Sequence, residues 1–219
     1  MDRLGRTLSH LRPCTTAPAA ADAPAPPSPP PLLRAAVTGS SSGIGLEFVR
    51  QLAADGYRVH ALCRTPSGAT ELQAIAAAHP ASVSVHTHDQ ASGSSCAALA
   101  AELAGTPIDL LVQNAGVGGS GPTRGDFSQD GQTFGGIDYD AWGDALQTNV
   151  LGVMRTVEAL TPSLLLSPSP RLVHISGIFG SLTNQVRAGT PSPDVAERTG
   201  SAGYFIYRSS KAAANMVAK

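Results

Sequence analysis

The amino-acid sequence predicts an α/β domain of three layers, with a parallel sheet between two layers of helices. Short apolar runs alternate with stretches of helical periodicity from Leu32 onward. Strands that alternate with helices pair in parallel, because right-handed crossovers place the helices on the faces of the sheet. The 219 residues are 42% hydrophobic, which is sufficient apolar content to bury the core of such a domain.

Five apolar runs are expected to be strands, since each is short and bounded by Gly, Pro, Asp or Asn. They are residues 32–37, 57–62, 83–86, 108–113 and 171–176. Helices are expected between them, at residues 43–54, 70–79, 92–104 and 140–160, and a last helix starts near Tyr207. In the longest helix six apolar residues recur at steps of three and four, which predicts one buried face. They are Trp142 as a core anchor, Leu146, Val150, Val153, Val157 and Leu160.

The first 33 residues are expected to form a disordered leader outside the fold. Eight of the 17 prolines lie between Pro13 and Pro31, and residues 17–31 are almost wholly alanine and proline. This composition favours extended conformations and cannot pack a core. An arginine-bearing, acid-poor leader is also typical of an organelle transit peptide. The domain is therefore expected over residues 34–219, in the cytoplasm or, with a transit peptide, in a plastid or mitochondrion.

The charge and the cysteines argue against several classes of function. Lys plus Arg is 15 and Asp plus Glu is 16, so no general nucleic-acid or anionic-membrane surface is expected. No segment reaches the roughly 18 uninterrupted apolar residues of a membrane helix. Cys14, Cys63 and Cys96 form no CxxC pair, so neither a disulfide framework nor a zinc knuckle is expected. His86 and His88 share one side of an expected strand, but no third ligand accompanies them, and surface histidines are expected instead of a metal site.

A glycine-rich turn follows the first expected strand and opens the first helix, with the sequence T-G-S-S-S-G-I-G at residues 38–45. Glycines let the backbone approach a diphosphate closely, and the free N–H groups of the helix start hold its negative charge. The alternative is a plain strand-to-helix turn. The candidate cofactor-binding residues here are Gly39, Ser41, Ser42, Gly43, Ile44 and Gly45.

The same turn contains G-x-S-x-G around Ser41, the pattern of a nucleophile elbow in hydrolases. A serine hydrolase would also need an acid and a histidine, and Asp109 and His174 follow in the required order. However, only one expected strand precedes the elbow, and the chain has no H-G-G-G-like oxyanion segment. A serine hydrolase is therefore a remote alternative.

Four further motifs follow along the chain: Q-N-A-G at residues 113–116, T-N-V-L-G around Asn149, H-I-S-G-I-F-G at residues 174–180, and Y-R-S-S-K from Tyr207 to Lys211. In this order they resemble the short-chain dehydrogenase/reductase family over residues 34–219. The resemblance implies a Rossmann-type three-layer sandwich with the parallel strand order 3-2-1-4-5. It also implies that Asn114, Ala115 and Gly116 lie beside the cofactor.

Tyr207 and Lys211 are four residues apart, so their side chains share one helix face. A free phenol has a pKa near 10, and a nearby ammonium favours the phenolate. The resemblance implies that Tyr207 donates a proton to a substrate carbonyl while a nicotinamide hydride attacks the carbonyl carbon. It further implies that Lys211 binds the ribose hydroxyls and that Asn149 holds a water in the proton relay.

The residues after the second strand favour NADP(H) over NAD(H). Cys63 stands where NAD-preferring relatives carry an acid for the ribose 2′-hydroxyl, and Arg64 is well placed to pair with a 2′-phosphate. Ser42 could add a hydrogen bond but no charge. Asp89, after the third strand, matches the family residue near the adenine, or alternatively caps a turn ahead of Ser92.

Two departures from the family pattern bear on activity. Gly177 stands where the family carries its catalytic serine, and the adjacent Ser176 is expected on the opposite face of the strand. Losing one donor to a developing oxyanion can cost on the order of 10²–10³ in rate. The family also continues with further strands and a substrate-covering segment, whereas this chain stops at Lys219. Five strands with an uncovered edge are therefore expected, without the usual last strands, which puts a homo-oligomer in doubt.

The expected function is that of an NADP(H)-dependent oxidoreductase that reduces a small-molecule carbonyl or oxidises an alcohol, similar to the carbonyl reductases of the family. Its candidate catalytic residues are Tyr207, Lys211, Asn149 and Ser176. The main alternative is a catalytically impaired or incomplete relative, which would bind the nucleotide without turnover.

Overall fold

The computed structural model describes residues 32–119, 130–183 and 204–218. Almost all of the expected leader, residues 1–31, lies outside the described residues, as do segments 120–129 and 184–203. Within the three described ranges, no helix combines the length and the apolar character needed to cross a membrane.

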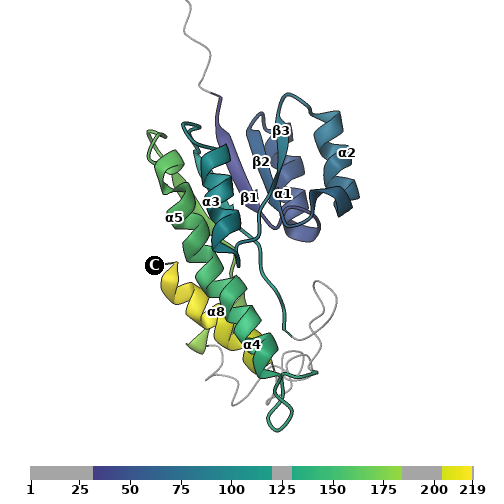
Figure 1. Cartoon of the computed structure of the whole chain (residues 1–219), viewed down its shortest axis with the longest axis vertical. Coiled ribbons are helices and arrows are strands. Elements are labelled where there is room, and N and C mark those ends of the chain that lie inside the picture. Colours follow the sequence, from purple (N-terminus) through teal and green to yellow (C-terminus); the bar gives the residue numbers. More distant parts are fainter. Residues whose placement is uncertain (1–31, 120–129, 184–203, 219) are drawn as a thin grey trace, which may run out of the picture. The chain divides into compact units, whose positions relative to one another are not determined.

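Strands and helices alternate along the chain, as expected (Figure 1). The elements in order are β1 (Arg34–Thr38), α1 (Gly43–Ala54), β2 (Arg58–Cys63), the 3₁₀ turn η1 (Pro66–Gly68), α2 (Thr70–Ala78), β3 (Val83–Thr87), α3 (Gly93–Glu102), β4 (Leu110–Gln113), α4 (Tyr139–Leu146), the π-helical turn η2 (Gln147–Leu151), α5 (Gly152–Leu164), β5 (Arg171–His174), the 3₁₀ turn η3 (Ile178–Gly180) and α8 (Phe205–Val217).

All five strands are parallel, in the order β3-β2-β1-β4-β5, which confirms the predicted topology. Val37 of β1 pairs with Ala61 of β2 on one side and with Val112 of β4 on the other. From β1 the chain adds β2 and β3 on one side, and then crosses to add β4 and β5 on the other side. Open parallel sheets bind ligands at the carboxyl ends of the two strands where the order reverses, here β1 and β4. In the described part of the chain no strand pairs with the outer side of β5, and its Leu172 is 46% exposed.

The sheet separates two apolar layers, as successive residues of a strand point to opposite faces. Val37 and Val112 pack with residues of α1 and α2, whereas Ala36 and Leu111 pack with residues of α3 and α5. Figure 1 shows these two pairs of helices on opposite sides of the sheet. The three-layer prediction is therefore confirmed.

The helix predicted over residues 140–160 is divided into α4 and α5 by the π-helical turn η2. A π turn contains more residues than an α turn, so it rotates the face that follows it. Val153 and Leu160, beyond this turn, are buried as predicted. Before it, Leu146 is 36% exposed, and Trp142 stacks on Tyr139 with their ring centroids 6.2 Å apart. The prediction of Trp142 as a core anchor was therefore wrong.

Both histidines expected at the surface are buried, His86 at 8% and His88 at 4% exposure, so that expectation was wrong. Their side chains face α3 and α5, and polar side chains of these helices contact their ring nitrogens. His86 Nδ1 lies 2.8 Å from a carboxylate oxygen of Glu102, and His88 Nε2 lies 3.0 Å from Thr156 Oγ1. Among residues 32–119, 130–183 and 204–218, no three His, Cys, Asp or Glu side chains are grouped as metal ligands.

A buried glutamine holds the start of α8, which begins two residues before the predicted position. The residue before the helix, Tyr204, has the left-handed φ of 63° and makes no side-chain cap. Instead, the Gln132 carbonyl accepts the N–H of Phe205 at 3.2 Å, and Gln132 Oε1 accepts the N–H of Tyr207 at 3.1 Å. Gln132 Nε2 donates to the Gly118 carbonyl at 3.2 Å, which ties α8 to the chain after β4.

We expect Gln132→Ala to destabilise the fold by about 1–3 kcal/mol, because it leaves the half-buried N–H of Tyr207 and the half-buried carbonyl of Gly118 without their partners. Urea unfolding measures the loss, and hydrogen exchange should locate it at the first turn of α8. Gln51→Ala, at an exposed position of α1, is the matched control, expected within about 0.5 kcal/mol of the parent chain. Equal stability of the two variants would contradict this role of Gln132.

Candidate functional site

The candidate site lies where β1 and β4 end side by side. The Thr38 hydroxyl accepts the backbone N–H groups of Asn114 and Ala115, at 3.0 and 2.9 Å. In return, the Asn114 amide donates to the Thr38 carbonyl at 3.0 Å. The glycine-rich turn and the Q-N-A-G motif are thus held as one unit at this end of the sheet.

Two glycines of the turn are required by close packing. A Cβ on Gly39, whose φ is 66°, would lie 2.8 Å from the Ala115 Cα. A Cβ on Gly45 would lie 2.3 Å from the Gly39 carbonyl oxygen and 2.4 Å from the Asn114 amide nitrogen. Any side chain at either position would push the turn away from the end of β4.

A cleft of about 290 Å³ opens beside this unit. It is lined by Gly39, Ser42, Gly43, Arg64, Asp89, Gln90, Asn114, Ala115, Gly116, Val117 and Thr148. Ser41 lines a neighbouring hollow with Ser42 and Arg64, while Ile44 is 64% exposed and outside the cleft. Asp89 lines the cleft and also accepts the N–H of Ala91 at 3.0 Å, so it holds the turn ahead of Ser92.

Tyr207 and Lys211 share one face of α8, and Lys211 adjoins the cleft. Lys211 is 6% exposed, and its Nζ donates to the Ile175 carbonyl at 3.1 Å. The same Nζ lies 5.8 Å from the centroid of the Tyr207 ring. A Cβ on Gly116, which lines the cleft, would be 3.6 Å from this Nζ, so the ammonium adjoins the cleft wall.

Burial decides the protonation of both groups. It raises the pKa of Tyr207 and lowers the pKa of Lys211, since the neutral form of each is easier to bury. Burial, followed by the charge of Lys211, lowers the pKa of His174 as well. Burial thus shifts the pKa of Tyr207 in the direction opposite to the one expected from a nearby lysine.

Asn149 lies in the π-helical turn η2 and joins three parts of the site. Its Oδ1 accepts the N–H of Val117 at 2.8 Å, and its Nδ2 donates to the Val117 carbonyl at 2.9 Å. Its Nδ2 also donates to the Ser210 hydroxyl of α8 at 2.9 Å. The Asn149 side chain is thus occupied by protein partners, and it connects the cleft wall to the helix of Tyr207.

Ser176 and Gly177 differ in their surroundings. The Ser176 hydroxyl donates to the Asn215 side chain, one helical turn beyond Lys211 on α8. Gly177 is extended, with φ −171° and ψ 172°, and an added Cβ there would have no atom within 4 Å. The backbone at Gly177 therefore has the space and the conformation to carry a serine side chain.

The residues of the hydrolase alternative are not brought together. Asp109 accepts the backbone N–H of Arg34 at 2.7 Å, at the first residue of β1. Ser41 follows the other end of β1, and a five-residue strand separates the two ends by about 16 Å. Asp109 also accepts the Ser167 hydroxyl at 2.6 Å, so it serves to hold the strand starts. A triad of Ser41, Asp109 and His174 does not form.

Three residues of the site were not singled out from the sequence. Thr38 and Ser210 lie inside recognised motifs, where their hydroxyl groups could have been considered as links between elements. Gln90 is buried at 3% exposure, lines the cleft and donates to the carbonyls of Ala115 and Thr148. Nothing in the local pattern marks Gln90, because its partners come from distant segments.

Known structures share this fold. A short-chain dehydrogenase/reductase from Burkholderia multivorans with bound NADP is 30% identical, with a TM-score of 0.67, over 86% of this chain and 71% of that one. The NADPH-bound carbonyl reductase from chicken fatty liver is 26% identical with a TM-score of 0.67, over 85% of this chain and 71% of that one.

Sequence relatives lead to the same family. (+)-Neomenthol dehydrogenase of Arabidopsis thaliana is 34% identical over 164 residues, which are 68% of this chain and 55% of the relative. The chain thus spans about half the length of the curated relatives it matches. The family model for short chain dehydrogenases matches residues 34–189. With a matching family model, the predicted strand order and NADP-bound structural relatives, this chain belongs to the short-chain dehydrogenase/reductase family.

Proposed function

We propose that this chain is an NADP(H)-dependent oxidoreductase that reduces a small-molecule carbonyl, or oxidises the corresponding alcohol, with Tyr207 as the acid or base. The observation that carries the proposal is the position of Tyr207 and buried Lys211 on one face of α8, next to the cleft at the ends of β1 and β4. Residues 34–219 would form the nucleotide-binding domain of this enzyme.

The residues around the cleft fit a nicotinamide dinucleotide. Gly39 and Gly45 leave no side chain between the turn and the end of β4, so a diphosphate can approach the backbone. The first turn of α1 carries no acidic residue, which leaves its N–H groups suited to an anion. When bound, the cofactor supplies a hydride; the chain's own residues bind it, orient the substrate and move the proton.

Arg64 is the basis for preferring NADP(H). It lines the cleft and the adjoining hollow next to Ser42, and Cys63 before it supplies no carboxylate to repel a 2′-phosphate. The structural relatives from Burkholderia multivorans and chicken, which have NADP or NADPH bound, support this choice.

The raised pKa of Tyr207 suits the direction of carbonyl reduction. A general acid must be protonated, and a pKa raised by burial keeps the phenol protonated at neutral and moderately alkaline pH. The reverse reaction needs the phenolate, so alcohol oxidation should increase with pH. Lys211 would hold the ribose hydroxyls, and Asn149 would keep the cleft wall and α8 at a fixed spacing.

The activity of an intact site is tested by Tyr207→Phe, which removes only the acidic hydroxyl. The parent protein should consume NADPH absorbance with small aldehydes or quinones, and the variant should lose about 10²–10⁴-fold in rate. Tyr139→Phe, at a 73% exposed tyrosine, is the matched control and should keep the parent rate. NADPH binding without turnover by the folded parent would instead support the catalytically impaired alternative.

The cofactor preference is tested by Arg64→Ala. Loss of a charged hydrogen bond to the 2′-phosphate should weaken NADPH binding by about 10–100-fold and leave NADH binding nearly unchanged. Fluorescence titration of both cofactors measures the two effects, and Arg171→Ala, at an exposed arginine of β5, is the control. An equal loss for NADPH and NADH would refute the 2′-phosphate contact.

Gly177→Ser tests whether a missing hydroxyl limits the rate. The open space at this position accepts the side chain without displacing a neighbour. A hydroxyl that donates to the developing oxyanion should raise kcat about tenfold or more. Ser176→Ala, which removes the hydroxyl facing Asn215, separates the two positions and should have a smaller effect. An unchanged kcat in Gly177→Ser would show that another group already supplies this donor.

A further inference from the structure

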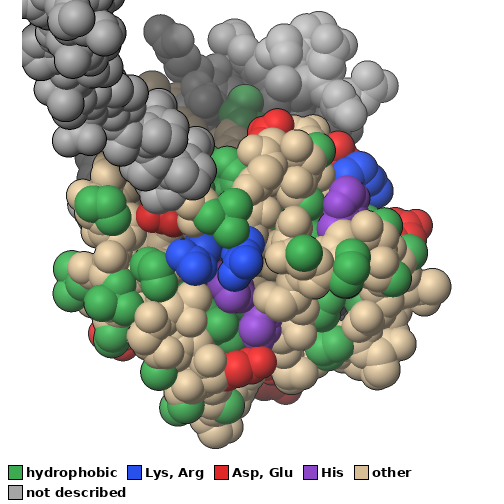
Figure 2. Space-filling view, turned by 90° about the horizontal axis from the view of Figure 1, so that it is seen from above, with side chains coloured by type: hydrophobic (Ala, Val, Ile, Leu, Met, Phe, Trp, Pro, Cys, Tyr) green, Lys and Arg blue, Asp and Glu red, His purple; other side chains and the backbone are tan. Residues whose placement is uncertain are grey.

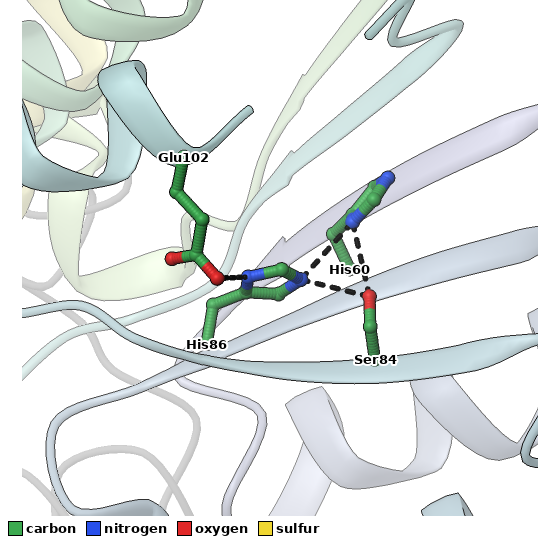
Figure 3. Close-up of polar contacts among 4 residues, drawn as sticks. All are labelled: His60, Ser84, His86 and Glu102. Carbon is green, nitrogen blue, oxygen red and sulfur yellow. Dashed lines mark hydrogen bonds and ion pairs between the residues drawn. The ribbon is translucent and has the colours of Figure 1, made fainter. Parts of the chain in front are cut away.

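A second polar cluster lies at the opposite end of the sheet from the cleft. Figure 3 shows its members: His60 of β2, Ser84 and His86 of β3, and Glu102 at the end of α3. Ser84 and His86 are two residues apart on one strand, so they share a face of the sheet. His60 pairs with Ser84 across the parallel ladder, which adds a third side chain to the same place.

The contacts connect a hydroxyl, an imidazole and a carboxylate in series. Ser84 Oγ lies 2.7 Å from His86 Nε2, and His86 Nδ1 lies 2.8 Å from Glu102 Oε1. A carboxylate at Nδ1 fixes the proton on that nitrogen, which leaves Nε2 free to accept the serine proton. A nucleophile next to a base that is oriented by a third group is the arrangement that activates a serine.

The burial of the three groups matches these roles. Ser84 is exposed to solvent, the His86 side chain is 8% exposed, and the Glu102 side chain is 54% exposed. The hydroxyl can therefore meet a ligand, while the base is shielded and held in place.

His60 adds a third polar group, which contacts both the hydroxyl and the imidazole (Figure 3). Its Nδ1 lies 3.1 Å from Ser84 Oγ and 3.1 Å from His86 Nε2. Burial is the main cause that lowers the pKa of His60 to about 4, and the charge of Arg34 acts in the same direction, so this ring is neutral at pH 7. We place its proton on Nδ1, because it can then donate to Ser84 Oγ while the hydroxyl donates to His86.

The surroundings can stabilise a developing negative charge. The charges of Arg34 and Arg58, at the starts of β1 and β2, act on His60. Figure 2 looks onto this end of the sheet, where basic side chains lie beside histidines and an acidic group. β3 is the edge strand of the sheet, with β2 as its neighbour. The Ser82 carbonyl accepts the N–H of Val59, and the N–H of His88 donates to the Cys63 carbonyl, so the backbone groups of even-numbered residues point toward β2. Backbone groups of successive residues point to opposite sides of a strand, so the N–H of Val85 points away from β2. This N–H directly follows the serine, as oxyanion donors often do.

We propose that Ser84, activated by His86 and oriented by Glu102, is a nucleophile that accepts the acyl group of small activated esters. The Ser84 oxygen bonds to the ester carbonyl carbon, the ester C–O bond breaks, and the hydroxyl proton passes through His86 Nε2 to the leaving alcohol. Water then attacks the acyl carbon while His86 Nε2 takes one of its protons, the bond between that carbon and Ser84 Oγ breaks, and His86 returns the proton to Ser84 Oγ as the carboxylic acid is released. This site is independent of the oxidoreductase function proposed for the cleft.

The test uses p-nitrophenyl acetate with the full chain, followed by peptide mass spectrometry and by release of nitrophenol. We expect acetylation of Ser84 and hydrolysis that Ser84→Ala lowers by about 100-fold. Glu102→Gln keeps the size of the side chain and should slow acetylation of Ser84 by about tenfold or more, because the imidazole loses its orienting charge. Ser94→Ala, at an exposed serine of α3 without a histidine contact, is the matched control and should change neither readout.

Thermal unfolding of each variant shows whether it is folded, which matters for Ser84→Ala because this hydroxyl also contacts His60 and His86. Acetyl groups spread over lysines and other serines, with none on Ser84, would overturn the proposal. So would hydrolysis that Ser84→Ala leaves unchanged, since the cluster would then be only a polar link between β2, β3 and α3.

Discussion

The burial of the Lys211 ammonium is the constraint on which the candidate site depends. A charged group at 6% exposure must be hydrogen-bonded, and the Ile175 carbonyl beyond β5 is the acceptor. This contact keeps the end of β5 against α8. The turn η3 then packs so closely that a Cβ on Gly180 would lie 2.9 Å from the Lys211 carbonyl oxygen. The position of Lys211 therefore sets the distance between the sheet and the helix.

The same packing orients Tyr207 and determines its acidity. Phe179 of η3 contacts both Tyr204 and Tyr207, with ring centroids 5.6 Å apart in each pair. Gln132 holds the backbone of Tyr207 from the other side. The enclosure that fixes the ring also removes water from it, and so raises the pKa of its hydroxyl. Positioning and protonation state are consequences of one packing arrangement.

Periodicity and turn chemistry were sufficient to predict the parallel sheet and the helices between its strands, whereas the strand order was predicted from the family resemblance of the motifs. Local patterns failed where the outcome depends on partners from distant segments. At the π-helical turn, Asn149 contacts Val117 and Ser210, which belong to other segments of the chain. The periodicity of the helix alone could not predict these contacts. His86 can be buried because both of its ring nitrogens have hydrogen-bond partners, Ser84 and Glu102. Gln132 lies in an irregular segment, and its role depends on α8, about 75 residues later.

The two ends of the sheet thus carry different chemistry on one scaffold. Glycines, free helix N–H groups and a basic side chain gather where β1 and β4 end, whereas histidines and a serine gather where β2 and β3 begin. The central claim concerns the first of these, that NADP(H) binds beside Tyr207 and Lys211. Calorimetric titration of NADPH into the folded chain and into Lys211→Met tests it most directly. The account predicts one-to-one binding that Lys211→Met weakens; no binding by the folded parent, or equal affinity in the variant, would contradict it.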